Sequence, residues 1–91
     1  MIPKKFQLMG KSFTVKVIGK NNWEDPEIWG QCDFANNTIE VLDLNPETNE
    51  QTFFHELVHA ILMTMNNKLN KNETFVDMFG ALLHQALKTS K

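Results

Sequence analysis

The pentapeptide His55-Glu56-Leu57-Val58-His59 constrains this chain most, because it places two histidines four residues apart in an apolar segment. In an α-helix, four residues make about 400° of turn and about 6 Å of rise, so both imidazoles lie on one face. Two neutral imidazoles so placed can bind one Zn²⁺, and the glutamate between them can reach a water on the metal. The spacing predicts a hydrolytic zinc site if the rest of the chain supplies a third ligand, a substrate groove and a core.

The composition predicts one globular domain spanning residues 1–91. Apolar residues make up 42% of the chain and charged residues 22%, which argues against disorder. The formal net charge is −2 and the basic residues are scattered, so we expect no nucleic-acid partner. No stretch approaches the roughly 20 apolar residues of a membrane span, so we expect no membrane association.

The cysteine content and the first residues predict a cytoplasmic protein. Cys32 is the only cysteine, so the chain can form neither an internal disulfide nor a cysteine-based zinc site. A lone thiol fits a reducing compartment, and we expect Cys32 to act as a small buried apolar residue. The first ten residues contain no apolar run long enough for a signal peptide.

Alternating polarity in the N-terminal half predicts β-strands, in the ranges 6–9, 13–18, 28–35 and 38–44. Asn36-Asn37 between the last two predicts a tight hairpin turn, because asparagine tolerates positive φ. We therefore expect a mostly antiparallel sheet of three to four strands, in a register that the sequence leaves open.

Capping residues and apolar periodicity predict two helices in the C-terminal half. Asn45-Pro46 suits the start of the first helix, and Thr48-x-x-Gln51 offers a competing capping box. Asn72 suits the N-cap of a second helix over 73–87. Gly80 lies inside that second helix at a cost of about 1 kcal/mol relative to alanine, which indicates close packing of the two helices. The predicted fold class is thus α+β, with a small sheet packed on the His55 helix and a C-terminal helix.

A hydrolytic zinc ion needs three protein ligands and one open position. The candidates beyond His55 and His59 are His84 and the carboxylates. Glu73 is the strongest of them, because it opens the second helix after a connection short enough to force an antiparallel helix hairpin. Asp77 lies one turn later on the same face, where a carboxylate can hydrogen bond to the outer nitrogen of a zinc-bound imidazole.

The two motifs together resemble a known family. His55-Glu56-Leu57-Val58-His59 followed by Glu73-Thr74-Phe75-Val76-Asp77 is similar to the HExxH plus ExxxD arrangement of gluzincin-type zinc metallopeptidases. The compactness and the order of sheet, His helix and ligand helix most resemble ImmA/IrrE-type peptidases of phages and mobile elements. The chain departs from larger gluzincins in its short connection between the helices and in having no tyrosine, the residue often used to stabilise the oxyanion.

The resemblance implies zinc on His55, His59 and Glu73, with Glu56 as general base and Asp77 bonded to a ligand. It also implies a zinc-dependent metalloendopeptidase that cleaves a protein or peptide substrate, for which a regulatory protein is a natural choice. A strand edge of the sheet could bind that substrate in extended form. His84 could donate to the oxyanion.

Three other interpretations stay open at this point. One is a zinc-containing regulatory binding module on the same fold that cleaves nothing. Another is a structural helix hairpin without metal. A third follows SprT-type zinc proteases, which share the first motif and use a later histidine as third ligand, a position that only His84 can fill here.

Overall fold

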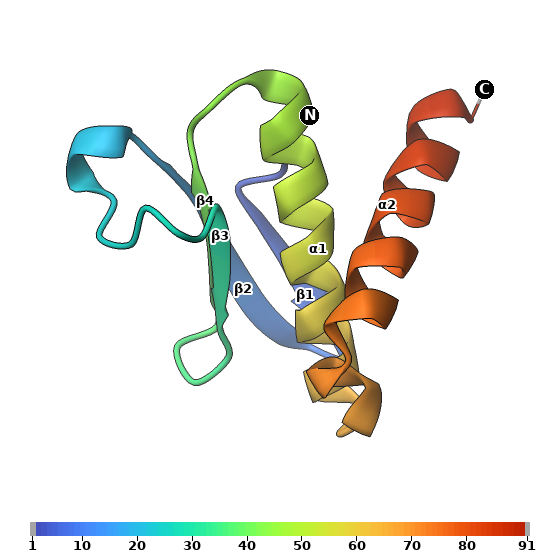
Figure 1. Cartoon of the computed structure of the whole chain (residues 1–91). Coiled ribbons are helices and arrows are strands. Elements are labelled where there is room, and N and C mark those ends of the chain that lie inside the picture. Colours follow the sequence, from blue (N-terminus) through green and yellow to red (C-terminus); the bar gives the residue numbers. More distant parts are fainter. Residues whose placement is uncertain (1, 91) are drawn as a thin grey trace.

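The computed structural model describes residues 2–90, which form a four-stranded sheet and two long helices (Figure 1). Helix α1 (Pro46–Thr64) packs on the sheet, and helix α2 (Glu73–Thr89) packs on α1. Figure 1 shows α1 lying between the sheet and α2. The predicted α+β class, with a small sheet and two helices, is confirmed, and the sheet packs on α1.

The sheet has the strand order β1-β2-β4-β3. Its strands are β1 (Lys5–Leu8), β2 (Lys11–Ile18), β3 (Gly30–Asp33) and β4 (Thr38–Leu42). The pairs β1–β2 and β3–β4 are antiparallel, as expected, whereas β2 and β4 pair in parallel. The segment between β2 and β3 carries the chain across the sheet and leaves β3 at one edge.

Alternating side chains of the two central strands form the core against α1. Phe13 and Val15 of β2 and Ile39 and Val41 of β4 are buried, together with Phe53 of α1. Their spacing of two puts them on one face of the sheet, as the polarity pattern predicts. This packing holds one side of α1 against β3 and β4.

Both long helices begin at the asparagines expected from the sequence. The backbone N–H of Thr48 donates to the side-chain oxygen of Asn45 over 2.9 Å, so Asn45 caps α1 and the competing capping box is not the start. The backbone N–H of Phe75 donates to Asn72 over 3.0 Å, which caps α2. Between the helices lies a short 3₁₀ helix, η2 (Lys68–Lys71).

Asn49 ties the start of α1 to the end of β4. This side chain is buried, donates to Asp43 Oδ1 over 2.9 Å and accepts from the backbone N–H of Leu44 over 2.9 Å. Satisfying both ends of a buried amide in this way fixes the angle at which α1 leaves the sheet.

Gly80 is the point of closest approach between the two helices. A Cβ placed on Gly80 would lie 3.2 Å from Cα of His55 and 3.3 Å from the carbonyl oxygen of Phe54. The predicted reason for a glycine inside α2 is therefore confirmed. Neither helix among residues 2–90 combines the length and the apolar character that crossing a bilayer requires.

Candidate metal centre

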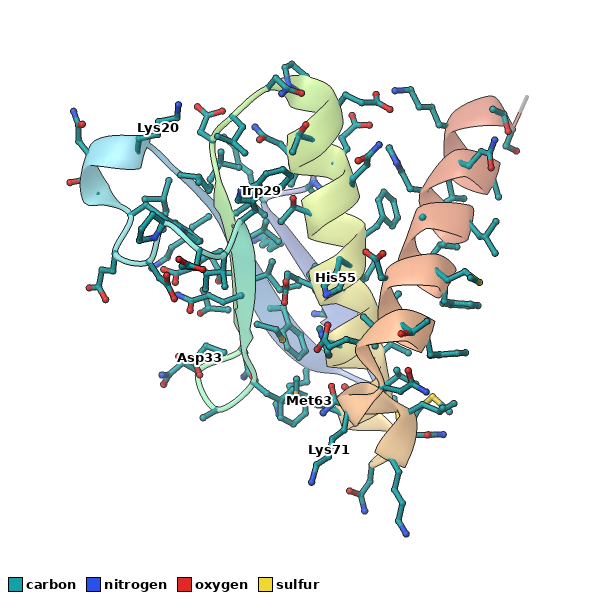
Figure 2. All side chains as sticks on the ribbon, viewed as in Figure 1. Lys20, Trp29, Asp33, His55, Met63 and Lys71 are labelled. Carbon is teal, nitrogen blue, oxygen red and sulfur yellow. The ribbon has the colours of Figure 1, made fainter. Side chains whose placement is uncertain are left out.

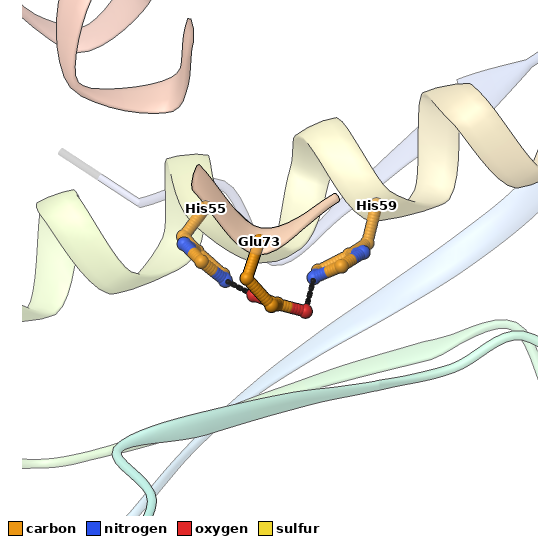
Figure 3. Close-up of side chains that lie close together, drawn as sticks. All are labelled: His55, His59 and Glu73. Carbon is orange, nitrogen blue, oxygen red and sulfur yellow. Dashed lines mark hydrogen bonds and ion pairs between the residues drawn. The ribbon is translucent and has the colours of Figure 1, made fainter. Parts of the chain in front are cut away.

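Three side chains from the two helices converge at one point on the side of the helices that faces β3 (Figure 3). His55 Nε2 lies 3.2 Å from Glu73 Oε1, and His59 Nε2 lies 3.2 Å from Glu73 Oε2. One donor atom from each residue lies within 4.8 Å of the other two. The structure thus brings together the two histidines of the motif and the carboxylate that the sequence indicates as their partner.

The donor set and its spacing fit a zinc ion. Two imidazole nitrogens and one carboxylate oxygen are the ligands found in many hydrolytic zinc sites. Around a tetrahedral zinc with bonds of about 2 Å, ligand atoms are about 3.3 Å apart. Each histidine Nε2 lies 3.2 Å from a different oxygen of Glu73, and one donor atom from each of the three residues lies within 4.8 Å of the other two. The same three residues could also form a simple ion-pair cluster, so the geometry permits a metal without requiring one.

The outer nitrogen of each histidine also has a neighbour. His59 Nδ1 lies 2.7 Å from Asn70 Oδ1, an atom that can only accept, so His59 donates from Nδ1 and keeps Nε2 open toward Glu73. His55 Nδ1 lies at ion-pair distance, 3.5 Å, from Asp77 Oδ1. The structure therefore places Asp77 where the sequence predicts it, and adds Asn70.

Glu56 is buried beside the convergence point. Glu56 is only 7% exposed. Within residues 2–90, its carboxyl accepts no hydrogen bond. Burial raises the pKa of this carboxyl above its ordinary value, although nearby His55 and His59 act in the opposite direction. A carboxylate with a raised pKa is a better proton acceptor near neutral pH than an exposed one.

Two cavities flank the convergence point, and both are lined by Glu56. The cavity of about 360 Å³ on the His55 side also contacts Trp29, Gly30 and Asp77. The cavity of about 350 Å³ on the His59 side also contacts Cys32. Because Gly30 and Cys32 both belong to β3, this edge strand borders the whole site.

Gly30 allows β3 to approach α1 at this point. A Cβ on Gly30 would lie 2.4 Å from Thr52 Cγ2 and 3.3 Å from Glu56 Cγ. Any larger side chain would force either the Thr52 side chain or the edge strand to move. The glycine therefore sets the width of the site on its sheet side.

His84 lies outside this cluster. It is buried, its Nε2 is 2.9 Å from Glu50 Oε1, and its ring stacks on Phe54 with the centroids 5.2 Å apart. The structure thus gives His84 a packing contact between the helices. It leaves Glu73 as the ligand candidate nearest to His55 and His59.

Cys32 is half-buried, and its role is close to the one expected from the sequence. It packs against the sheet core, as Phe34 also does. Burial, with smaller contributions from Glu56 and Asp33, raises the pKa of its thiol to about 12. The side chain is therefore a neutral thiol that behaves as an apolar residue at the wall of the site.

Asn70 is the contact that sequence reasoning missed. It lies in η2, within a connection that contains several asparagines and no periodic pattern. Nothing in the sequence distinguishes it from its neighbours.

Comparison of the chain with family models, curated proteins and solved structures found no match.

Proposed function

We propose that this chain is a zinc-dependent metalloendopeptidase that hydrolyses peptide bonds of a protein substrate. The observation that carries the proposal is the convergence of His55, His59 and Glu73 next to the buried carboxyl of Glu56. A structural ion-pair cluster has no need of a buried carboxyl without hydrogen-bond partners, whereas hydrolysis needs such a base. The similarity of the two motifs to gluzincin-type peptidases points the same way.

The chain's own residues have separable tasks in this proposal. His55, His59 and Glu73 hold the ion, with Asn70 and Asp77 orienting the two imidazoles. A zinc ion bound there would supply Lewis acidity toward the scissile carbonyl and the attacking water. Glu56 takes a proton from that water and later delivers it to the leaving amine.

The edge position of β3 offers a way to hold the substrate. Among residues 2–90, β3 pairs with a strand on one side only, so its other edge has backbone groups along the site that no described strand contacts. An extended peptide could add there as a further strand and present its carbonyl to the metal. Backbone pairing of this kind positions many different sequences in the same way.

The test replaces the proposed base and keeps the ligands. Glu56→Gln should retain one zinc per chain, measured by elemental analysis, and lose at least about a hundredfold of its activity on denatured, dye-labelled casein. Glu24→Gln, at an exposed loop acid that lines neither cavity of the site, should match the wild type in both measurements. Undiminished casein cleavage by Glu56→Gln would refute the assignment of the base.

A second candidate function is a zinc-containing regulatory binding module that does not cleave its partner. Two observations favour it: the chain has no tyrosine to stabilise an oxyanion, and His84 lies away from the site. α2 also exposes several large apolar side chains that would suit a protein partner, namely Met78, Phe79, Leu82 and Leu87. Zinc-loaded wild-type protein that cleaves none of a panel of unfolded proteins would favour the binding module. Protein purified without zinc, and unable to take it up, would exclude both candidates.

A further inference from the structure

The cavity on the His55 side has a one-sided charge. Three carboxyl groups line it, from Glu27, Glu56 and Asp77, and no lysine or arginine does. The cavity on the His59 side differs, because Lys71 is among its lining residues. The His59-side cavity is thus of mixed charge, with Lys71 beside Glu56 and Glu73, whereas the charged side chains of the His55-side cavity are all acidic.

The walls of the same cavity are suited to a long aliphatic stem. Ile28 and Trp29 line it and are 37% and 55% exposed. Figure 2 shows Trp29 where the chain enters β3 and His55 on α1. Lysine and arginine bury their methylene stems along apolar surface while their charged ends stay near water, and both interact favourably with an indole face. A volume of about 360 Å³ lies within the range of ligand-binding pockets and exceeds that of one such side chain.

A hydrogen-bonded loop holds this wall in place. The indole N–H of Trp23 donates to the carbonyl oxygens of Asp25 and Ile28, over 2.7 and 3.0 Å. The backbone N–H of Glu27 donates to Asp25 Oδ1 over 2.9 Å. These hydrogen bonds fix the backbone of the segment that carries Glu27 and Ile28, and so keep Glu27 at the cavity.

Glu56 marks this cavity as more than a group of surface acids. It is nine-tenths buried, it forms no hydrogen bond within residues 2–90, and it faces the cavity beside His55. A largely buried carboxyl that forms no hydrogen bond interacts favourably with a proton donor or a cation that enters the cavity. The polar side chains of Thr48 and Gln51 complete the lining.

We propose that the His55-side cavity binds a lysine or arginine side chain of the substrate, with its stem along Ile28 and Trp29 and its charge toward Glu27 and Asp77. The site would then select peptides that carry a basic residue next to the bond placed at the metal. This inference rests on the proposed function for the identity of the ligand as a substrate residue. The cavity and its charge do not depend on catalysis.

A binding experiment tests the cavity without any cleavage. ¹⁵N-labelled protein, with and without zinc, is titrated with N-acetyl-arginine methylamide and, in parallel, with the uncharged N-acetyl-norleucine methylamide. The Trp29 indole N–H signal, assigned with Trp29→Phe, reports occupancy. We expect the arginine compound to bind at least about fivefold more tightly than the norleucine compound, with the difference shrinking as salt is added.

Matched variants separate the cavity from general surface charge. Glu27→Gln should weaken binding of the arginine compound about threefold and leave the norleucine compound unchanged. Glu24→Gln, at a nearby loop acid outside the cavity, should change neither. Equal binding of the two compounds by the wild-type protein, or an undiminished preference in Glu27→Gln, would overturn the proposal.

A cleavage experiment then links the cavity to the substrate. Zinc-loaded protein is incubated with serum albumin peptides produced by a glutamate-specific protease, and the new ends are mapped by mass spectrometry. We expect lysine and arginine to be enriched within two residues of the cleaved bond, and Glu27→Lys to remove that enrichment. Preferential arginine binding without any cleavage would refute the peptidase and support the cavity. Cleavage without basic enrichment, together with equal binding of both compounds, would refute the cavity and support the peptidase.

Discussion

Asn70 determines which nitrogen of His59 is available to a metal. Its side-chain oxygen accepts from Nδ1 over 2.7 Å and so leaves the Nε2 lone pair facing Glu73. We expect Asn70→Ala to lower zinc affinity by about tenfold or more, because the imidazole loses its preferred tautomer and orientation. Competition with a zinc-sensitive dye would measure this. Asn21→Ala, at an exposed position of the 3₁₀ helix η1 (Lys20–Asn22), serves as control, and equal affinity of the two variants would contradict the role of Asn70.

The Cys32 thiol should be unusually resistant to alkylation. Its pKa is raised from 9.0 to about 12, so its thiolate fraction at pH 8 falls about a thousandfold relative to an ordinary cysteine. We expect iodoacetamide to label the folded, metal-free protein far more slowly than the protein unfolded in guanidinium chloride, as followed by mass spectrometry. Equal labelling rates in the two states would show that the thiol is not protected.

The same shift makes the folded protein less stable at high pH. The folded state keeps its thiol proton until a pH of about 12, whereas the unfolded chain begins to release it near 9.0. The free energy of unfolding should therefore fall as the pH rises from 9 toward 12. The stabilisation that comes from the raised pKa of the thiol is fully present below pH 9. Cys32→Ala should lack that part of the decline in urea unfolding experiments.

At the scale of single residues, the sequence predicts those parts of the site that obey a helical period. His55, Glu56 and His59 lie on one helix, and Glu73 opens the next one. Their spacing alone therefore predicts that they form one group. Asn70 follows no period, because it lies in a 3₁₀ turn whose path depends on how the two helices pack. Its contact becomes visible only once that packing is known.

Among the secondary-structure elements, α1 and α2 depend on Gly80 for their separation. Gly80→Val would force its side chain against His55 Cα, which lies 3.2 Å from the position of an added Cβ. We expect a loss of about 1–3 kcal/mol in the free energy of unfolding and weaker zinc binding, because displacing α2 also displaces Glu73. Thermal unfolding and dye competition would measure the two effects.

The neighbouring residue provides the control for this substitution. Ala81 is exposed on α2, so Ala81→Val introduces the same side chain with only a small loss of helix propensity. If Gly80→Val proved as stable as Ala81→Val and bound zinc equally well, the close approach of the two helices would not govern the site.

The helices could be predicted more fully than the strands, for a physical reason. Caps such as Asn45 and Asn72 act within four residues, so local sequence determines where α1 and α2 begin. The parallel pairing of β2 with β4 joins residues far apart in the chain, and nothing local encodes it. The strand predicted over 28–35 is also shorter in the structure, because Ile28 and Trp29 form the cavity wall instead.

For the whole molecule, a bound metal should contribute a large share of stability. A chain of 91 residues has a small core, and ligands from two helices are joined only in the folded state. At free zinc one hundred times Kd, binding adds about 2.7 kcal/mol, which should raise the unfolding midpoint by roughly 10–20 °C. Calorimetry with and without a chelator would measure the shift. Glu73→Ala should show little of it, and a full shift in that variant would exclude Glu73 as a ligand.

The short connection between the helices has a consequence for the order of folding. His55, His59 and Glu73 all lie within 19 residues, whereas the sheet must pair β2 with β4 across the long segment between them. Closing a short loop costs less chain entropy and is faster than forming distant strand contacts. A metal ion captured by the helix hairpin would therefore act early in folding, as a nucleus on which the sheet assembles, and zinc should accelerate refolding as well as slow unfolding.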